Sequence, residues 1–252
     1  MPELTDAQLV RYGRHLMLPE LDVAGQERLL AARVLLIGVG GLGSPIALYL
    51  GAAGVGTLVI VDHDIVDLSN LQRQIAHGSP DIGQTKVASA AAAIARLNPE
   101  VKVVAIDHRL EGLALEREIK AADLVIDASD NFATRFALNA ACWRAGKPLV
   151  SGAAIRWEGQ VAVFDPQNPT SPCYQCLYSE DDDEALNCSE NGVAAPLVGV
   201  IGSLQALEAL KFLTGAGESL VGYVLYFDGK WAEWRKLRLT PQPSCPVCGL
   251  KP

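Results

Sequence analysis

Residues 35–62, LLIGVGGLGSPIALYLGAAGVGTLVIVD, hold three glycines with the spacing G-x-G-x-x-G. Gly38, Gly40 and Gly43 follow an apolar run at 34–37 and overlap a run of small apolar residues at 42–53. This order predicts a strand, a tight turn and a helix, and the free N–H groups at the start of such a helix bind phosphate. The stretch therefore predicts a nucleotide site. It does not distinguish a redox dinucleotide from a nucleotide that is consumed.

Patterns typical of strands and helices alternate along the first half of the chain. Strands are expected at 34–37, 57–62, 101–106, 123–127 and 148–151, and helices at 42–53, 86–97, 112–121 and 131–145. Two amphipathic helices, at about 6–14 and 23–31, precede them. The alternation predicts an α/β fold of Rossmann-like type, with a doubly wound and mostly parallel sheet.

The pattern changes from Glu158 onward. Residues 159–165 and 222–239 alternate like antiparallel strands, and an apolar helix at about 197–213 lies between them. We expect these antiparallel strands to extend the parallel sheet. The prediction is therefore one domain over residues 1–252, with a nucleotide-binding half at 1–157 and an antiparallel half, containing paired cysteines, at 158–252.

Four of the six cysteines form two C-x-x-C pairs. The first pair is Cys173 and Cys176, and the second is Cys245 and Cys248. Two such pairs suit a tetrahedral Zn²⁺ site, and four thiolates leave no coordination position for a substrate, so the metal would be structural. The alternative is a redox motif, but a redox C-x-x-C normally opens a helix after a strand, whereas these pairs lie among prolines and polar residues.

The net charge and the apolar segments exclude some classes of partner. A formal net charge of −8 without a basic stripe argues against nucleic acid as the main partner. The N-terminal residues lack a signal-peptide core, and the long apolar runs are interrupted by glycine and end in charged residues. We expect a cytoplasmic protein that does not insert into a membrane.

A long loop at 63–85 separates the second strand from its helix. Arg73 lies in this loop and Lys86 starts the helix, so both can supply the positive charge that a triphosphate needs, although either alone is commonly a surface charge. Asp130 follows the fourth strand at the edge of the sheet where such folds bind ligands. There it suits Mg²⁺ bound to phosphates, and it also suits the N-cap of helix 131–145.

A group of motifs indicates a family. These are GVGGLGS, DHDIVDLSNLQRQ, IGQTKV, DASDN, SGAAIRWEGQ, CYQCL, GVIGSLQALEALK and CPVCG. Together they resemble the MoeB/ThiF/HesA family of bacterial relatives of ubiquitin-activating enzymes, most nearly its MoeB branch, over almost the whole chain. The resemblance implies an ATP-dependent adenylyltransferase, a nucleotidyltransferase that activates the C-terminal Gly-Gly carboxylate of a ubiquitin-like sulfur carrier and releases pyrophosphate. The carrier would be MoaD, for molybdopterin biosynthesis, or ThiS, for thiamine biosynthesis.

The resemblance also implies roles for individual residues. The implied nucleotide-binding residues are Gly38, Gly40, Gly41, Gly43, Asp62, Ser69, Asn70, Leu71, Gln72, Arg73, Lys86, Asp130 and Asn131. Among them, Arg73 and Lys86 would act on the phosphates and Asp130 would hold Mg²⁺. Arg14 matches an arginine that reaches the ATP of the neighbouring subunit, which implies a catalytic role for Arg14 and a homodimer.

Cys188 matches the position at which ubiquitin-activating enzymes place a thioester cysteine, and it is a candidate thiol nucleophile. Its acidic neighbours Glu184 and Glu190 are expected to raise its pKa, and adenylylation itself needs no thiol.

Two other classes of function remain open. An NAD(P)-dependent oxidoreductase uses the same glycine turn, but the cationic loop and the scattered histidines argue against it. A non-catalytic zinc-stabilised binding module would leave the cationic and acidic residues without a role.

Overall fold

The computed structural model describes residues 4–179 and 192–249. Its strands are β1 (Arg33–Ile37), β2 (Thr57–Val61), β3 (Lys102–Ile106), β4 (Leu124–Asp127), β5 (Leu149–Ile155), β6 (Glu158–Phe164), β7 (Tyr223–Asp228) and β8 (Glu233–Arg238). They form one 8-stranded sheet in the order β3-β2-β1-β4-β5-β6-β7-β8. The pairings from β3 to β5 are parallel and those from β5 to β8 are antiparallel, which confirms the predicted extension of a doubly wound sheet.

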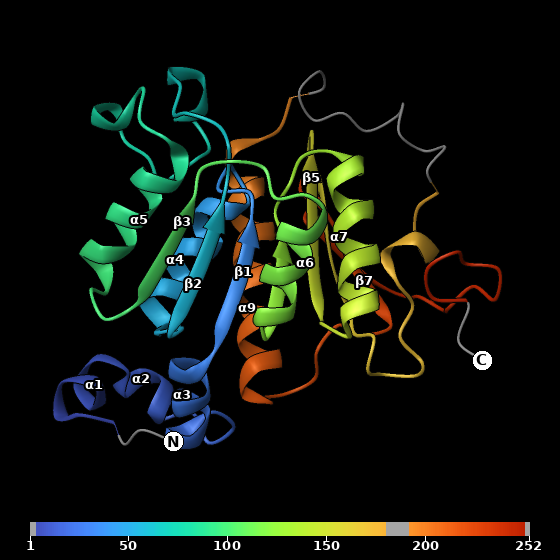
Figure 1. Ribbon diagram of the computed structural model, residues 1–252, viewed down its shortest axis with the longest axis horizontal. Helices are drawn as coiled ribbons and strands as arrows, with labels where there is room; N and C mark the ends of the chain where they lie inside the picture. The colour runs from blue at the N-terminus through green and yellow to red at the C-terminus, as the bar shows by residue number, and fades with distance from the viewer. Residues whose placement is uncertain (1–3, 180–191, 250–252) are drawn as a thin grey trace.

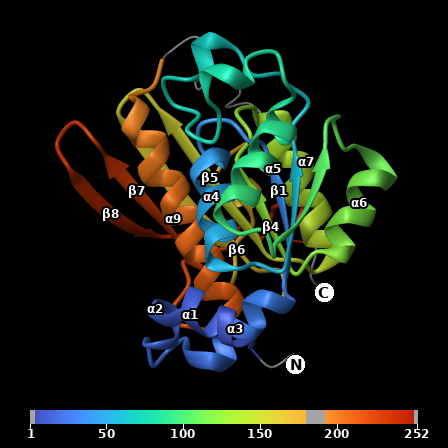
Figure 2. The same cartoon turned by 90° about the vertical axis from the view of Figure 1, so that its left-hand side faces the viewer.

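Helices cover both faces of the parallel part of the sheet (Figures 1 and 2). The longer helices are α3 (Asp22–Ala31), α4 (Gly43–Ala53), α5 (Lys86–Leu97), α6 (Gly112–Ala121), α7 (Phe132–Ala145) and α9 (Ala195–Thr214). Figure 2 shows α4, α5 and α9 on one face and α6 and α7 on the other.

The side chains of β1 show why both faces must be covered. Val34 and Leu36 belong to the core on the α4 side, whereas Leu35 and Ile37 belong to the core on the α7 side. Successive strand residues point to opposite faces, so this continuous apolar run requires a helix layer on each side.

The helix α9 is long and apolar enough by composition to cross a membrane. In the fold, however, half of its apolar window is buried, and α9 packs against α4, β5 and β6. Ile201, Gln205 and Ala209 on one side of α9 are almost fully buried in this packing. The apolar composition is therefore that of a helix in the protein core.

The structure differs from the sequence prediction at two places. The expected helix at about 6–14 is divided into α1 (Asp6–Arg11) and α2 (Gly13–Leu16). The break falls at Tyr12, which is buried and whose hydroxyl accepts a hydrogen bond from Asn98 Nδ2 at 2.9 Å. The fifth strand continues beyond residue 151 to Ile155 because it pairs with β6 along its whole length.

Candidate active site

A cavity of about 590 Å³ opens at the carboxyl ends of the parallel strands. It lies where β1 is flanked by β2 on one side and β4 on the other, the point at which the winding of the sheet reverses. The predicted residues that line it are Gly38, Gly40, Gly41, Asp62, Gln72, Arg73, Lys86, Asp130 and Asn131. Its volume is within the range of small-molecule sites.

The glycine turn between β1 and α4 needs glycine at two of its positions. Gly38 has φ +90°, and a Cβ there would lie 2.6 Å from the Ala128 carbonyl oxygen. A Cβ at Gly43 would lie 2.0 Å from the Gly38 carbonyl oxygen. Gly43 therefore does not contact the cavity but lets the first turn of α4 pack directly on the glycine turn.

Asp62, the acidic residue that follows β2, is tied to this turn. Its Oδ2 accepts a hydrogen bond from Val39 N–H at 2.8 Å, and its Oδ1 accepts one from Asp64 N–H at 3.0 Å. The carboxylate thus lies beside the glycine turn at the carboxyl end of β2, in the position where such a fold holds a ribose.

Lys86 is the first residue of α5 and is buried. Its Nζ lies 2.7 Å from Asp64 Oδ2. Burial raises the pKa of Asp64, but its hydrogen bond and charge interaction with Lys86 outweigh burial, so the pKa is lowered. Arg73 donates from its guanidinium to the Ser69 carbonyl oxygen at 3.1 Å. Both cations line the same cavity, as the sequence predicted.

Asp130 is exposed and lies in the short loop between β4 and α7. The N-cap of α7 is Asn131, whose Oδ1 accepts from Thr134 N–H at 2.9 Å, so the alternative of Asp130 as the N-cap is wrong. Asn131 Nδ2 lies 3.4 Å from Asp130 Oδ1. Asp130 is among the residues that line the cavity, where its exposed carboxylate is available to a cation.

The loop that carries Asp130 is held by hydrogen bonds to Asp127, the last residue of β4. This buried carboxylate accepts hydrogen bonds from the Ser129 N–H at 3.0 Å and the Ser151 hydroxyl at 3.1 Å. Arg135 lies 3.9 Å from Asp127 and donates to the Ser129 carbonyl oxygen at 2.9 Å. Burial raises the pKa of Asp127, and these partners oppose the rise. The network holds Ser129, the residue before Asp130, through both its N–H and its carbonyl oxygen.

Some predicted site residues lie outside the lining of this cavity. Ser69 and Asn70 belong to a 3₁₀ turn, Leu68–Asn70, that is capped by Asp67, and Leu71 follows it. Arg14 lies on α2 and lines a second cavity of about 430 Å³ between α2, α4 and α9. Figure 1 shows α2 at the opposite end of the sheet from the glycine turn.

The cavity also has lining residues that the sequence analysis did not propose. Six of them lie in two segments, just after β2 and between β3 and α6: His63, Asp64, His108, Arg109, Leu110 and Glu111. Arg109 Nη2 lies 3.2 Å from His63 Nε2, which joins the two segments. The strand order could have indicated them, because β3 lies next to β2 and its carboxyl end reaches the same edge of the sheet.

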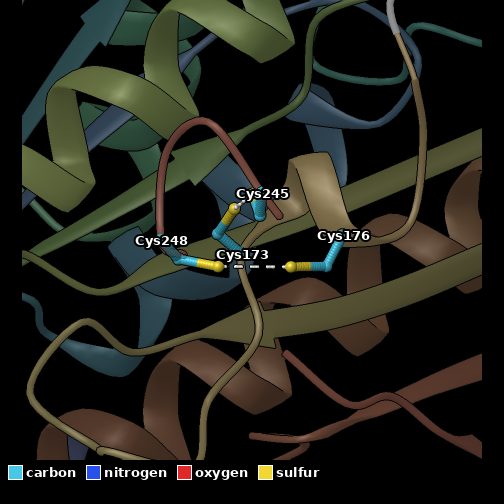
Figure 3. Close-up of side chains that lie close together, drawn as sticks. All are labelled: Cys173, Cys176, Cys245 and Cys248. Atoms are coloured by element: carbon cyan, nitrogen blue, oxygen red, sulfur yellow. Dashed lines mark hydrogen bonds between the residues drawn. The ribbon is translucent and has the colours of Figure 1, made fainter. Parts of the chain in front are cut away.

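The two cysteine pairs, far apart in the sequence, come together in space (Figure 3). Their four sulfur atoms all lie within 4.8 Å of one another. Cys173 and Cys245 are separated by 3.5 Å, and Cys176 and Cys248 by 3.2 Å. Zn–S bonds of about 2.3 Å in a tetrahedral site place sulfur atoms about 3.8 Å apart, so the cluster fits such an ion.

The thiols of the cluster shift one another's pKa values. A hydrogen bond from Cys173 lowers the pKa of Cys176 to about 4, and the same interaction raises the pKa of Cys173. The Gln242 N–H also points at Cys176 Sγ, at 3.4 Å. In contrast, Cys142 is isolated in the core, where burial raises its pKa and makes it unreactive. Cys188 lies outside the residues that the structure describes.

Comparisons with known proteins agree with this geometry. The sequence profile of the ThiF family matches residues 12–247. The chain is 47% identical to the molybdopterin-synthase adenylyltransferase of Escherichia coli over 249 residues, covering 99% of this chain and 100% of that protein. It is 44% identical to the sulfur carrier protein ThiS adenylyltransferase of Escherichia coli, covering 98% of this chain and 97% of the relative.

A solved structure shares the fold. The crystal structure of E. coli MccB with MccA-N7isoASN superposes with a TM-score of 0.82 at 22% identity, covering 98% of this chain and 76% of MccB. Neither the family nor the two relatives support the oxidoreductase alternative.

Proposed function

The chain belongs to the ThiF family, and on that basis we propose that it adenylylates the C-terminal carboxylate of a ubiquitin-like sulfur carrier protein with ATP. The two relatives described above are named as adenylyltransferases, one for molybdopterin synthase and one for the carrier ThiS. The carrier is therefore of the MoaD or ThiS type, and this protein has a place in molybdopterin or thiamine biosynthesis.

One observation carries this proposal more than any other. A glycine turn, a buried lysine, an arginine and an exposed carboxylate line the same cavity: Gly40, Lys86, Arg73 and Asp130. A redox dinucleotide needs the turn but not two cations from a long loop and helix start. A triphosphate carries more negative charge, and two cations beside a metal-binding carboxylate match it.

The reaction needs positioning and charge more than proton transfer. The carrier's terminal carboxylate is already ionised near neutral pH and attacks the α-phosphorus of ATP. A bond forms between the carboxylate oxygen and the α-phosphorus, the bond to the bridging oxygen of the β-phosphate breaks, and pyrophosphate leaves with its electron pair. Arg73 and Lys86 stabilise the charge that develops on the phosphates and the leaving group.

We assign Asp130 to Mg²⁺. A carboxylate with its face open to the cavity suits this ion, which binds one or two carboxylates and takes its other ligands from phosphates and water. The ion would supply charge neutralisation of the phosphates. Asp127 and Arg135 contribute by holding the N–H and the carbonyl oxygen of Ser129, the residue before Asp130.

We assign the cysteine cluster to a structural Zn²⁺. Cys173, Cys176, Cys245 and Cys248 would fill all four positions of a tetrahedral site and leave none for substrate. The ion would join the segment after β6 to the segment after β8, which otherwise meet through a small apolar cluster with Trp143 and Val247 and through hydrogen bonds from Gln242 to Cys176.

We propose a homodimer in which Arg14 completes the site of the partner. Arg14 lies on α2, at the end of the sheet opposite the glycine turn, and it lines a different cavity from Asp130. It therefore does not reach the nucleotide cavity of its own chain. A neighbouring chain could receive it, because the second cavity is bordered by the exposed apolar residues Tyr49 and Leu207.

Ligand binding separates this function from the oxidoreductase alternative. Isothermal titration with Mg²⁺·ATP and with NADH should show binding of ATP only, and immobilised protein should retain a MoaD-type or a ThiS-type carrier. Retention of one carrier identifies the pathway. Tight binding of NADH without binding of ATP would contradict the proposal.

A further inference from the structure

His77 is buried beneath the glycine turn, in the loop between β2 and α5. Its Nε2 lies 3.1 Å from the Val39 carbonyl oxygen, and its Nδ1 lies 2.9 Å from Ser89 Oγ. A carbonyl oxygen only accepts hydrogen bonds, so Nε2 carries the hydrogen. Burial lowers the pKa of His77, so the ring is neutral near pH 7, with Nδ1 beside the Ser89 hydroxyl.

The hydrogen bond from His77 fixes a peptide group of the glycine turn. The carbonyl of Val39 and the N–H of Gly40 belong to the same planar peptide. The described part of the chain has no cis peptide bond, so this N–H points away from the carbonyl and from His77. Gly40 lines the nucleotide cavity and His77 does not.

The N–H of Gly40 has no hydrogen-bond acceptor among residues 4–179 and 192–249. The neighbouring peptide is also fixed, because Val39 N–H donates to Asp62 at 2.8 Å. The side chain of Val39 is fully buried. Val39 is thus held through its N–H, its side chain and its carbonyl, and the free N–H of Gly40 is the group that this arrangement leaves for a ligand.

His77 also joins the other segments that border the cavity. Its backbone N–H donates to the Gln74 carbonyl oxygen at 3.1 Å, in the turn that carries Arg73. Ser89 lies on α5, which begins at Lys86. The imidazole therefore connects the glycine turn to α5, which begins at Lys86, while the backbone of His77 belongs to the turn that follows Arg73.

We propose that His77 is a positioning residue that aims the Gly40 N–H at a phosphate of the bound nucleotide. The role rests on the proposed ATP site. The chemistry is specific to Nε2, because only that nitrogen contacts the Val39 carbonyl. The amide nitrogen of a glutamine reaches about as far along the side chain as Nε2 of histidine, whereas that of asparagine reaches only about as far as Nδ1.

The test compares His77→Gln with His77→Asn by titration of Mg²⁺·ATP, after thermal unfolding shows that both variants fold. The asparagine variant should bind ATP about tenfold more weakly, the loss of about one hydrogen bond, while the glutamine variant stays within about threefold of the wild type. Ser89→Ala leaves the contact between His77 and Val39 in place, so it should lose less ATP affinity than His77→Asn.

A second measurement needs no variant. In ¹H–¹⁵N spectra of the wild-type protein, the Gly40 amide signal should shift on addition of Mg²⁺·ATP. Equal ATP affinities for the glutamine and asparagine variants, or a Gly40 signal that ATP leaves unmoved, would overturn the role of His77 while ATP binding by the wild type still stood. A wild type that does not bind ATP would instead remove the proposed function.

Discussion

The ammonium of Lys86 lies 2.7 Å from Asp64 Oδ2, and the two side chains differ greatly in exposure, at 7% for Lys86 and 52% for Asp64. Burying a charged group is costly unless the group is paired and hydrogen-bonded. Asp64 Oδ2 therefore pairs with the buried ammonium of Lys86 and orients it at the edge of the cavity, although Asp64 itself was not among the predicted site residues.

Asp64→Asn should consequently slow ATP–pyrophosphate exchange by roughly tenfold or more, the scale expected when one catalytic group is misplaced. Glu116→Gln is a matched control, because it removes a carboxylate from a surface ion pair with Arg144. The control should exchange at the wild-type rate. Equal rates for Asp64→Asn and the wild type would show that Lys86 needs no such partner.

Mixed dimers test the placement of Arg14. Neither Arg14→Ala nor Asp130→Ala should be active alone, but a mixed dimer should regain about half of the wild-type activity, because one of its two sites then has both groups. Activity of separately tagged, co-purified dimers measures this. A lack of rescue in verified mixed dimers would mean that Arg14 does not act across the interface.

Metal analysis tests the cysteine cluster. Purified protein should hold about one Zn²⁺ per chain, as a site with four thiolates predicts. Cys176→Ser should lose the metal and lower the melting temperature, whereas Cys142→Ser should keep it, because Cys142 is a core residue outside the cluster. Protein without zinc whose four thiols are freely titratable would contradict the assignment.

The pH dependence of stability tests the balance of forces at Asp127. Burial raises its pKa above the unfolded value despite Arg135 and two serines. A carboxyl with a raised folded pKa binds more protons in the folded state, so its contribution to stability is greatest below the unfolded pKa of about 3.9 and falls as pH rises. Urea unfolding measures the free energy of unfolding at pH 5 and pH 8. The stability of Asp127→Asn relative to the wild type should be greater at pH 8 than at pH 5. The opposite trend would mean that the ion pair with Arg135 outweighs burial.

The sequence predicted the framework of the fold because local patterns specify it. The glycine turn, the continuous apolar run of β1 and the two cysteine pairs each carry their own signal. The break at Tyr12 had no such signal, because it depends on a hydrogen bond with Asn98, which is distant in the sequence.

The candidate site was predicted in part for the same reason. Arg73, Lys86 and Asp130 lie in motifs, and they do line one cavity. Asp64, His77 and Arg109 act through contacts that only the fold creates: a buried lysine, a carbonyl of the glycine turn and the histidine after β2. Such residues are difficult to select from a single sequence, since their types are common on protein surfaces.

Carrier-dependent ATP–pyrophosphate exchange tests the central claim most directly. The wild type should catalyse exchange with a MoaD-type or a ThiS-type carrier that ends in Gly-Gly. Asp130→Ala, Arg73→Ala and Lys86→Ala should each lower the rate by about two orders of magnitude or more, with a smaller loss of ATP affinity, since these groups act mainly on the transition state. Cys188→Ala should leave exchange largely intact, because the adenylate forms before any thiol step. A wild-type protein that shows no exchange with either carrier would contradict the account.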